Sequence, residues 1–323
     1  MDRRQFISTT AWLGASALLA GSGRAVAQAY PSKPVTILCP FAAGGGGDAL
    51  TRVLADHVRT KRSVAAAVEY RPGAGATIAP GQIARAAPDG TTLGLYSISP
   101  FVVVPHLQRL PYDPLKDFTY IGIYAYIPIA FYVKTDSAHK DWAGVIKYAK
   151  DNPGKFRWGT SGVRGAAHIA VEAAFRKEGI QTTFVPFTGG SEAITALLGG
   201  HIEAVISADY GPQLSAGTVR LLALTGTEKL AGQPSLPTFK DLGYPLSTEA
   251  LYGLIGPAKL PAEIVSYWDG AIREMMKTDE FATALKAISA SPVYMNSADF
   301  TANVAENYRK IGEAMETLGF KKS

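Results

Sequence analysis

The spacing of apolar residues near the start of the chain predicts a strand that leads directly into a helix. Residues 35–39 are mostly apolar, and from Asp48 to about Lys61 apolar residues recur at helical spacing. Four consecutive glycines, Gly44–Gly47, separate the two segments. Because glycine has no Cβ, the N–H groups of this turn can approach a ligand, and the start of a helix favours an anion there. We expect an anion-binding turn, with a plain surface loop as the alternative.

The following segments continue the alternation of strand and helix. Residues 65–70 predict a second strand, a helix extends from Pro80 through Ala87, and residues 91–97 predict a third strand. This order implies a parallel sheet with helices on its faces. The segment from Ser97 to Pro100 follows the carboxyl end of a strand, which is where open α/β sheets bind ligands.

The middle of the chain repeats this pattern after a long apolar segment, residues 120–133, that contains Pro128. Proline fits poorly inside a central strand, so we interpret this segment as the crossing between two domains. Later strands are predicted at residues 156–162, 182–187, 203–208, 220–225 and 250–256. Later helices are predicted from Trp142, Gly165, Ser191, Pro261 and Ser297, with Ser191 and Ser297 as N-caps.

Two glycine-rich turns, at residues 44–48 and 188–191, come from different halves of the chain. An α/β protein of two lobes that face each other across a cleft explains both turns. We assign residues 28–127 and 250–323 to the first lobe, and residues 128–249 to the second.

Composition fits a globular protein and narrows its class. Of 323 residues, 47% are apolar and 18% charged, which suits one large or two ordinary domains and argues against disorder. The net charge of +5 includes no long basic run, so we expect no nucleic-acid partner. Cys39 is the only cysteine and the five histidines lack zinc-site spacing, so we expect no metal.

The first 27 residues have the pattern of an export signal. Arg3–Arg4 precede an apolar run at Ala11–Ala20, and Ala25–Ala27 matches a cleavage site. The apolar run is shorter than the roughly 20 residues that span a membrane. We expect cleavage after Ala27 and a periplasmic protein, by either the twin-arginine or the general secretory route. Loss of three arginines and one aspartate would lower the formal charge from +5 to +3.

Short motifs recur in a specific order along nearly the whole mature chain. They are Tyr30–Val35, Pro40–Asp48, Arg71–Gly75, Pro88–Leu93, Gly159–Val163, Val185–Gly190, Leu236–Phe239 and Tyr252–Leu254. Each motif is weak alone, but their order and spacing together resemble the Bug-type solute-binding proteins of tripartite tricarboxylate transporters.

This resemblance implies a fold, a ligand and a set of contacts. The fold is the type II, Venus-flytrap class of periplasmic binding protein, with a mostly parallel sheet in each lobe. The ligand is a small carboxylate held by backbone amides, hydroxyls and waters, without catalysis or a cofactor. We expect a monomer that serves either uptake, with the transporter's membrane subunits as partners, or sensing. The contacts carried over are Phe41, Ala43, Gly44, Gly45, Asp48, Ser97 and Ser99 from the first lobe, and Ser161, His168, Thr188, Gly189, Gly190, Ser207 and Asp209 from the second.

The sequence departs from the family pattern at a few positions. Arg164 stands where a small residue is usual, Tyr70 where asparagine is usual, and Ala76 and Ala79 where glycines are common. We include Arg164 among the candidate ligand contacts. If its guanidinium points into the cleft, it would favour a ligand with a second acidic group. The alternative is that it points into solvent at the cleft rim.

The glycine turn and two polar residues each allow a second interpretation. Gly44–Gly47 with Glu69 also fits a loose dinucleotide-binding pattern, so an exported nucleotide-dependent oxidoreductase is the main rival function. Asp48 is either an N-cap or a residue that orients a water at the ligand, and these roles are compatible. His168 is either a structural hydrogen-bonding residue or a ligand contact.

Overall fold

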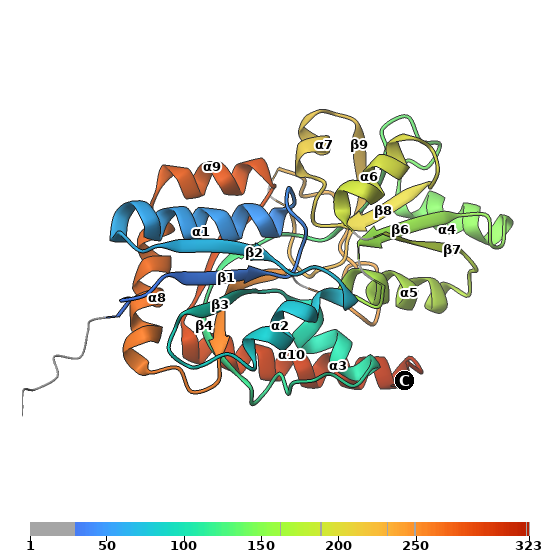
Figure 1. Cartoon of the computed structure of the whole chain (residues 1–323). Coiled ribbons are helices and arrows are strands. Elements are labelled where there is room, and N and C mark those ends of the chain that lie inside the picture. Colours follow the sequence, from blue (N-terminus) through green and yellow to red (C-terminus); the bar gives the residue numbers. More distant parts are fainter. Residues whose placement is uncertain are drawn as a thin grey trace, which may run out of the picture.

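The computed structural model describes residues 30–161, 163–187, 189–230, 232–248, 250–320 and 322, and only the backbone of Ser161. Figure 1 shows two α/β units side by side, with the chain passing between them. The expected export signal and its cleavage site lie outside the described residues, as does Thr188.

The larger unit, here called lobe 1, is built on a six-stranded sheet. Its strand order is β11 (Ser291–Met295), β4 (Phe118–Tyr126), β10 (Leu251–Pro257), β3 (Thr92–Tyr96), β1 (Val35–Cys39) and β2 (Ala66–Tyr70). β1 pairs in parallel with both β2 and β3. β10 and β11 return from the end of the chain and pair antiparallel with their neighbours.

The smaller unit, lobe 2, is built on a five-stranded sheet. Its strand order is β7 (Thr183–Phe187), β6 (Arg157–Ser161), β8 (Ala204–Ser207), β5 (Ala130–Lys134) and β9 (Val219–Leu224). β6 is parallel to β7 and β8, whereas β5 is antiparallel to β8 and β9. The α/β fold with one sheet per lobe is as expected. Both sheets are mixed, and their parallel part is the strand–helix–strand segment that the sequence pattern indicated.

Helices cover both faces of each sheet. Lobe 1 carries α1 (Gly46–Arg62), α2 (Ile78–Ile83), α3 (Val104–Leu107), α8 (Ala262–Met275), α9 (Asp279–Ala287) and α10 (Ser297–Thr317). Lobe 2 carries α4 (Trp142–Asp151), α5 (Ala166–Glu178), α6 (Gly190–Leu198) and α7 (Gly211–Ser215). Figure 1 shows α1 and α9 on one side of the first sheet, and α2 and α10 on the other. Two apolar clusters match these two faces, one around Ile37 and Leu54 and one around Ile83 and Phe300.

The chain crosses from lobe 1 to lobe 2 between β4 and β5, and returns between β9 and β10. The two crossing segments are hydrogen-bonded to each other. Ile127 N–H donates to the carbonyl of Ala250 at 2.9 Å, and Thr225 N–H donates to the carbonyl of Ile129 at 2.9 Å. A connection of this kind can act as a hinge, because few backbone angles need to change when the lobes move. The lobe boundaries at residues 127/128 and 249/250 stay a prediction.

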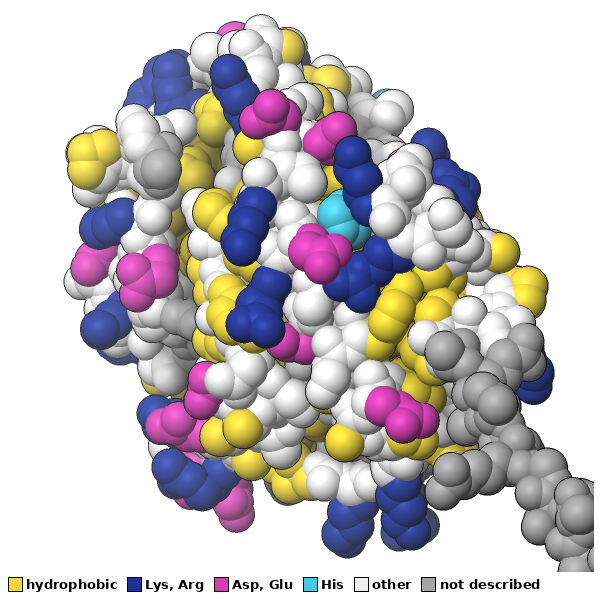
Figure 2. All heavy atoms as spheres, turned by 90° about the vertical axis from the view of Figure 1, so that its left-hand side faces the viewer, with side chains coloured by type: hydrophobic (Ala, Val, Ile, Leu, Met, Phe, Trp, Pro, Cys, Tyr) yellow, Lys and Arg dark blue, Asp and Glu magenta, His cyan; other side chains and the backbone are white. Residues whose placement is uncertain are grey.

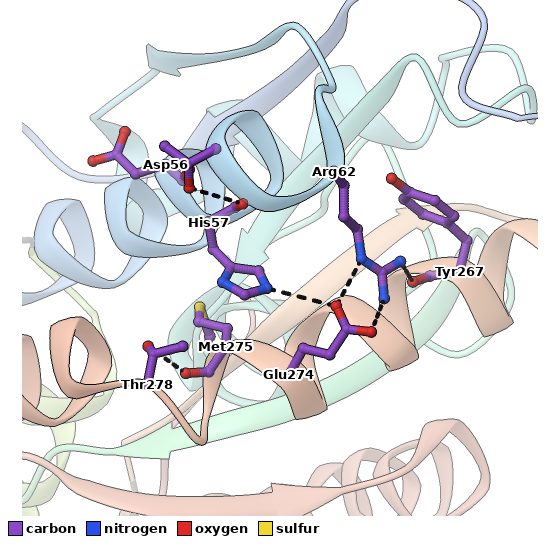
Figure 3. Close-up of polar contacts among 8 residues, drawn as sticks. Asp56, His57, Arg62, Tyr267, Glu274, Met275 and Thr278 are labelled. Carbon is purple, nitrogen blue, oxygen red and sulfur yellow. Dashed lines mark hydrogen bonds and ion pairs between the residues drawn. The ribbon is translucent and has the colours of Figure 1, made fainter.

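On the outer side of lobe 1, α1 packs against α8 through one polar group of residues (Figure 3). The Arg62 guanidinium donates to Glu274 Oε2 at 3.0 Å and to the carbonyl of Tyr267 at 2.9 Å. His57 Nε2 lies 3.8 Å from the same Glu274 oxygen. Basic and acidic side chains are interspersed on this face of the molecule (Figure 2).

Local details of several predicted elements were wrong. α1 begins at Gly46 with Gly45 as its N-cap, so the helix starts before Asp48. α2 ends at Ile83, well before Ala87. α6 begins at Gly190 with Gly189 as its N-cap, and Asn296 caps α10 by accepting a hydrogen bond from the backbone of Asp299. Serine was predicted as N-cap of both helices because it is a common cap. The observed caps lie two residues earlier in α6 and one residue earlier in α10.

Candidate functional site

A cleft of about 890 Å³ is lined by residues of both lobes. Predicted contact residues in its wall are Phe41, Ala43, Gly45, Ser97, Ser99, Arg164, Gly189, Gly190, Ser207 and Asp209. The cleft therefore brings together the two turns that the sequence places far apart. Its volume is in the range of small-molecule sites.

Three predicted contacts are not among the residues that line the cleft. Gly44, Asp48 and His168 are described residues that do not line the cleft. Ser161 is described only by its backbone, and Thr188 lies outside the described residues. These two stay predictions.

Asp48 holds the glycine turn in shape from behind. Its carboxylate accepts hydrogen bonds from Gly44 N–H at 2.8 Å and from the Tyr70 hydroxyl at 2.7 Å. Gly44 has a φ of 93°, a conformation that a residue with a Cβ rarely adopts. The N-cap role expected for Asp48 belongs to Gly45. Tyr70, at the position where the family pattern has asparagine, thus donates the second of these hydrogen bonds to the Asp48 carboxylate.

Asp209 of lobe 2 reaches across the cleft to the first turn of α1. Its Oδ1 accepts a hydrogen bond from Gly46 N–H at 3.1 Å, where the positive end of the helix dipole favours a carboxylate. Asp209 also sits against α6, since a Cβ built on Gly190 would lie 1.9 Å from Asp209 Oδ2. Asp209 is partly buried, and desolvation raises its pKa despite the hydrogen bond from Gly46.

The loop before α5 forms the opposite rim. Arg164 has a φ of 62°, and its N–H donates to His168 Nδ1 at 2.8 Å. The His168 ring stacks on Phe184 at 3.9 Å between centroids, and burial lowers its pKa, so Nδ1 is available as an acceptor. His168 thus makes a structural hydrogen bond, and its contact with a ligand stays a prediction. At the start of α5, Ala166 N–H donates to Ser99 Oγ of lobe 1 at 2.9 Å.

Two hydroxyls in the cleft wall have no partner among the described residues. They are Ser97 Oγ, at the end of β3, and Thr160 Oγ1, in β6, and both side chains are at least 96% buried. A buried hydroxyl without a partner carries a free-energy cost, which a ligand or water can remove. Ser207 differs, because its Oγ is bonded to the Tyr132 hydroxyl at 2.9 Å and to Asp209 N–H at 3.1 Å.

Sequence reasoning missed part of the wall. Thr160, the residue before the predicted contact Ser161, was passed over, yet it lines the cleft. Ile129 and Ala250 enter from the crossing segments, where no motif was recognised. Tyr252 enters from β10, and its motif did not indicate that it faces the cleft. Residues 72–76, which overlap the Arg71–Gly75 motif, also line the cleft.

Within the described residues, no group of three or more His, Cys, Asp or Glu side chains could hold a metal ion. Among the helices described, none has the length and apolar character needed to cross a membrane.

The two mixed sheets, the double connection and the cleft between the lobes define the class of periplasmic binding proteins. The chain matches the model of the tripartite tricarboxylate transporter family receptor over residues 50–320. It belongs to this family.

Relatives and solved structures agree with this assignment. The chain is 33% identical to a UPF0065 protein from the gbd 5′ region of Cupriavidus necator, over 100% of both chains. It is 25% identical to Protein BugT of Bordetella pertussis, over 91% of this chain and 92% of that protein. A structure of a periplasmic transporter has a TM-score of 0.84 at 30% identity and covers 91% of this chain and 99% of its own.

Two further structures have the same overall arrangement. The periplasmic binding protein BugD has a TM-score of 0.83 at 26% identity, covering 91% of this chain and all of its own. R. palustris Rpa4515, solved with adipate, has a TM-score of 0.83 at 25% identity and the same coverage.

Proposed function

We propose that the protein is a receptor that captures a small carboxylate-containing metabolite between its two lobes. The observation that carries this proposal is the cleft, into which both lobes contribute glycine-rich turns and unpaired, buried hydroxyls. Backbone N–H groups and hydroxyls are suitable donors for a carboxylate. Membership of a receptor family and the adipate held by a relative support the same ligand class.

The proposed ligand contacts are the predicted residues that line the cleft, together with Thr160. Ser161 and Thr188 also remain proposed contacts. Asp48 and His168 act indirectly, because they hold the Gly44 turn and the Arg164 loop in place. Asp48 orients backbone in this proposal, and a bound water beside it stays compatible with that role.

The proposal includes export and a membrane partner. Family members are periplasmic binding proteins, and residues 1–27 have the pattern of a signal peptide cleaved after Ala27. We infer a monomeric periplasmic receptor that works without a cofactor and delivers its ligand to transporter membrane subunits or to a sensing system.

The oxidoreductase alternative gains no support. A dinucleotide would place its pyrophosphate at the start of the helix after Gly44–Gly47. That position faces the Asp209 carboxylate, which would repel phosphate. Glu69, the residue expected to bind a ribose, is paired with Arg71 at 2.6 Å.

A ligand screen by thermal unfolding tests the proposal. A carboxylate present at 100 times its Kd should stabilise the protein by about 2.7 kcal/mol, which raises Tm by several degrees. The screen should contain mono-, di- and tricarboxylates together with NAD and NADP. A shift with the dinucleotides alone would contradict the receptor function.

A further inference from the structure

The cleft offers little positive charge to an anionic ligand. Among the described residues that line the cleft, one is basic, Arg164, and two are acidic, Glu192 and Asp209. A ligand with two or three carboxylates would therefore bring more negative charge than this wall can balance. Charges confined in a site of low dielectric interact more strongly than they do in water.

The Asp209 carboxylate occupies the starts of two helices, where an acidic group of a ligand would otherwise bind most favourably. Its Oδ1 lies 3.1 Å from Gly46 N, at the start of α1, and its other oxygen lies against Gly190 at the start of α6. Burial raises the pKa of Asp209, while the hydrogen bond from Gly46 N–H favours its charged form. A second ligand carboxylate at this end of the cleft would meet repulsion instead of a donor.

The rest of the wall suits an apolar body with one polar end. Apolar side chains lining the cleft include Phe41, Ile98, Val104, Ile129, Phe187 and Tyr252. The hydroxyls of Ser97 in lobe 1 and Thr160 in lobe 2 are buried donors without a hydrogen-bond partner among the described residues. Small-molecule sites generally combine apolar walls with a few placed polar groups, and apolar side chains of this kind can pack against an apolar ligand body.

We propose that the cleft selects monocarboxylates with a sizeable apolar body, such as aromatic or medium-chain aliphatic acids, and that Asp209 excludes acids with a second carboxylate. This selectivity rests on the proposed receptor function and names its ligand class. It makes Asp209 a specificity-determining residue, distinct from the groups that hold the first carboxylate.

Matched pairs of acids test the selectivity directly. Calorimetric titrations of the full mature chain should compare hexanoate with adipate, and benzoate with terephthalate. Each pair shares its carbon skeleton or ring and differs by one carboxylate. We expect the monocarboxylate of at least one pair to bind about tenfold or more tightly than its dicarboxylate partner, because like charges brought together are strongly unfavourable.

Asp209→Asn tests the assigned residue. The variant keeps an oxygen that can accept from Gly46 N–H but removes the charge. The affinity for the dicarboxylate should therefore rise about fivefold or more relative to the affinity for its monocarboxylate partner. Asp151→Asn is the matched control, because Asp151 lies on α4 of the same lobe, is 59% exposed and is outside the cleft wall. Its ratio should equal that of the wild type, and Tm values should show that both variants are folded.

The outcomes separate this inference from the function on which it rests. Equal affinities within both pairs, or a ratio that Asp209→Asn leaves unchanged, would overturn the selectivity and leave a carboxylate receptor. Failure of every carboxylate to bind would contradict the receptor function itself. The wild-type comparison remains a complete test if Asp209→Asn does not fold.

Discussion

At the scale of single residues, positive φ angles explain two departures from the family pattern. Arg164 has a φ of 62° and Ala76 a φ of 69°, both in the left-handed region where glycine fits best. This explains why small residues and glycines are usual at these positions. The sequence alone shows the departure, but the backbone angle depends on the surrounding turns. Arg164 thus adds a charge to the cleft rim at the expense of a less favourable backbone.

Arg164 should contribute to carboxylate binding through its charge. Arg164→Gln keeps much of the length but removes the charge, so we expect a loss of about 1 kcal/mol, or roughly fivefold in Kd. The value is modest because the side chain is exposed at the rim. The loss should shrink in about 0.5 M salt, which screens exposed charges. Titration of the ligand from the screen at low and high salt measures both effects.

Arg273→Gln provides the control for this charge change. Arg273 lies on α8, is 61% exposed and pairs with Asp269, away from the cleft. Its removal should leave Kd unchanged at either salt concentration. If Arg164→Gln behaved in the same way, Arg164 would have no part in binding, and selectivity would rest on backbone and hydroxyl groups.

At the scale of elements, the sequence pattern was sufficient to predict the secondary structure where a strand and a helix follow each other closely. The predicted strands at residues 35–39 and 65–70 and the helix between them match β1, β2 and α1 within a few residues. β11 was missed, because its five residues include Pro292 and its partner β4 lies more than 160 residues earlier. Pairing at that distance is decided by the assembled sheet, and a short edge strand leaves little trace in local pattern.

The contact between α1 and α8 should make stability depend on pH. Burial is the largest influence on the His57 pKa and lowers it from its ordinary value of 6.5, and Nε2 has no hydrogen-bond partner among the described residues. A lowered pKa means that the unfolded chain binds the proton first as pH falls. The contribution of His57 to stability is therefore complete above about pH 6.5 and is lost as pH falls through the lowered folded pKa.

His57→Gln should reduce this pH dependence, because glutamine does not titrate. Urea unfolding at about pH 7.5 and pH 5 measures the loss of unfolding free energy over the interval. The loss should be smaller in His57→Gln than in the wild type. His201→Gln, a change at an exposed histidine, is the control. If His57→Gln lost as much unfolding free energy as the wild type, neighbouring Glu274 would offset the burial of the His57 ring.

At the scale of the whole molecule, the sequence could predict two lobes and the turns that face each other. It could not predict which side chains cross between them. Asp209 was a candidate contact, yet its bond to the start of α1 depends on how the two sheets meet. The same holds for Ser99, whose Oγ accepts from the start of α5. Each lobe thus supplies an acceptor for the first turn of a helix in the other lobe.

These reciprocal bonds should hold the lobes together even without ligand. Ser99→Ala removes the acceptor for Ala166 N–H, which shifts the balance towards an open form by about 0.5–1.5 kcal/mol. Nitroxide labels at Lys116 of lobe 1 and Lys147 of lobe 2, both 79% exposed, can report the distance between lobes by pulsed electron spin resonance. The only native cysteine, Cys39, is buried, so engineered cysteines at these sites can be labelled selectively.

The distance distribution of the ligand-free Ser99→Ala variant should be longer and broader than that of the wild type. Saturating ligand should restore it, because a ligand that bridges the lobes favours the closed form. Ser137→Ala is the control, since Ser137 Oγ accepts from His139 N–H within lobe 2. The apparent Kd of Ser99→Ala should rise as its open fraction rises, because only the closed form holds the ligand from both lobes. Identical distributions in Ser99→Ala and Ser137→Ala would show that the Ser99 bond does not set the position of the lobes, and closure would then depend on ligand and hinge alone.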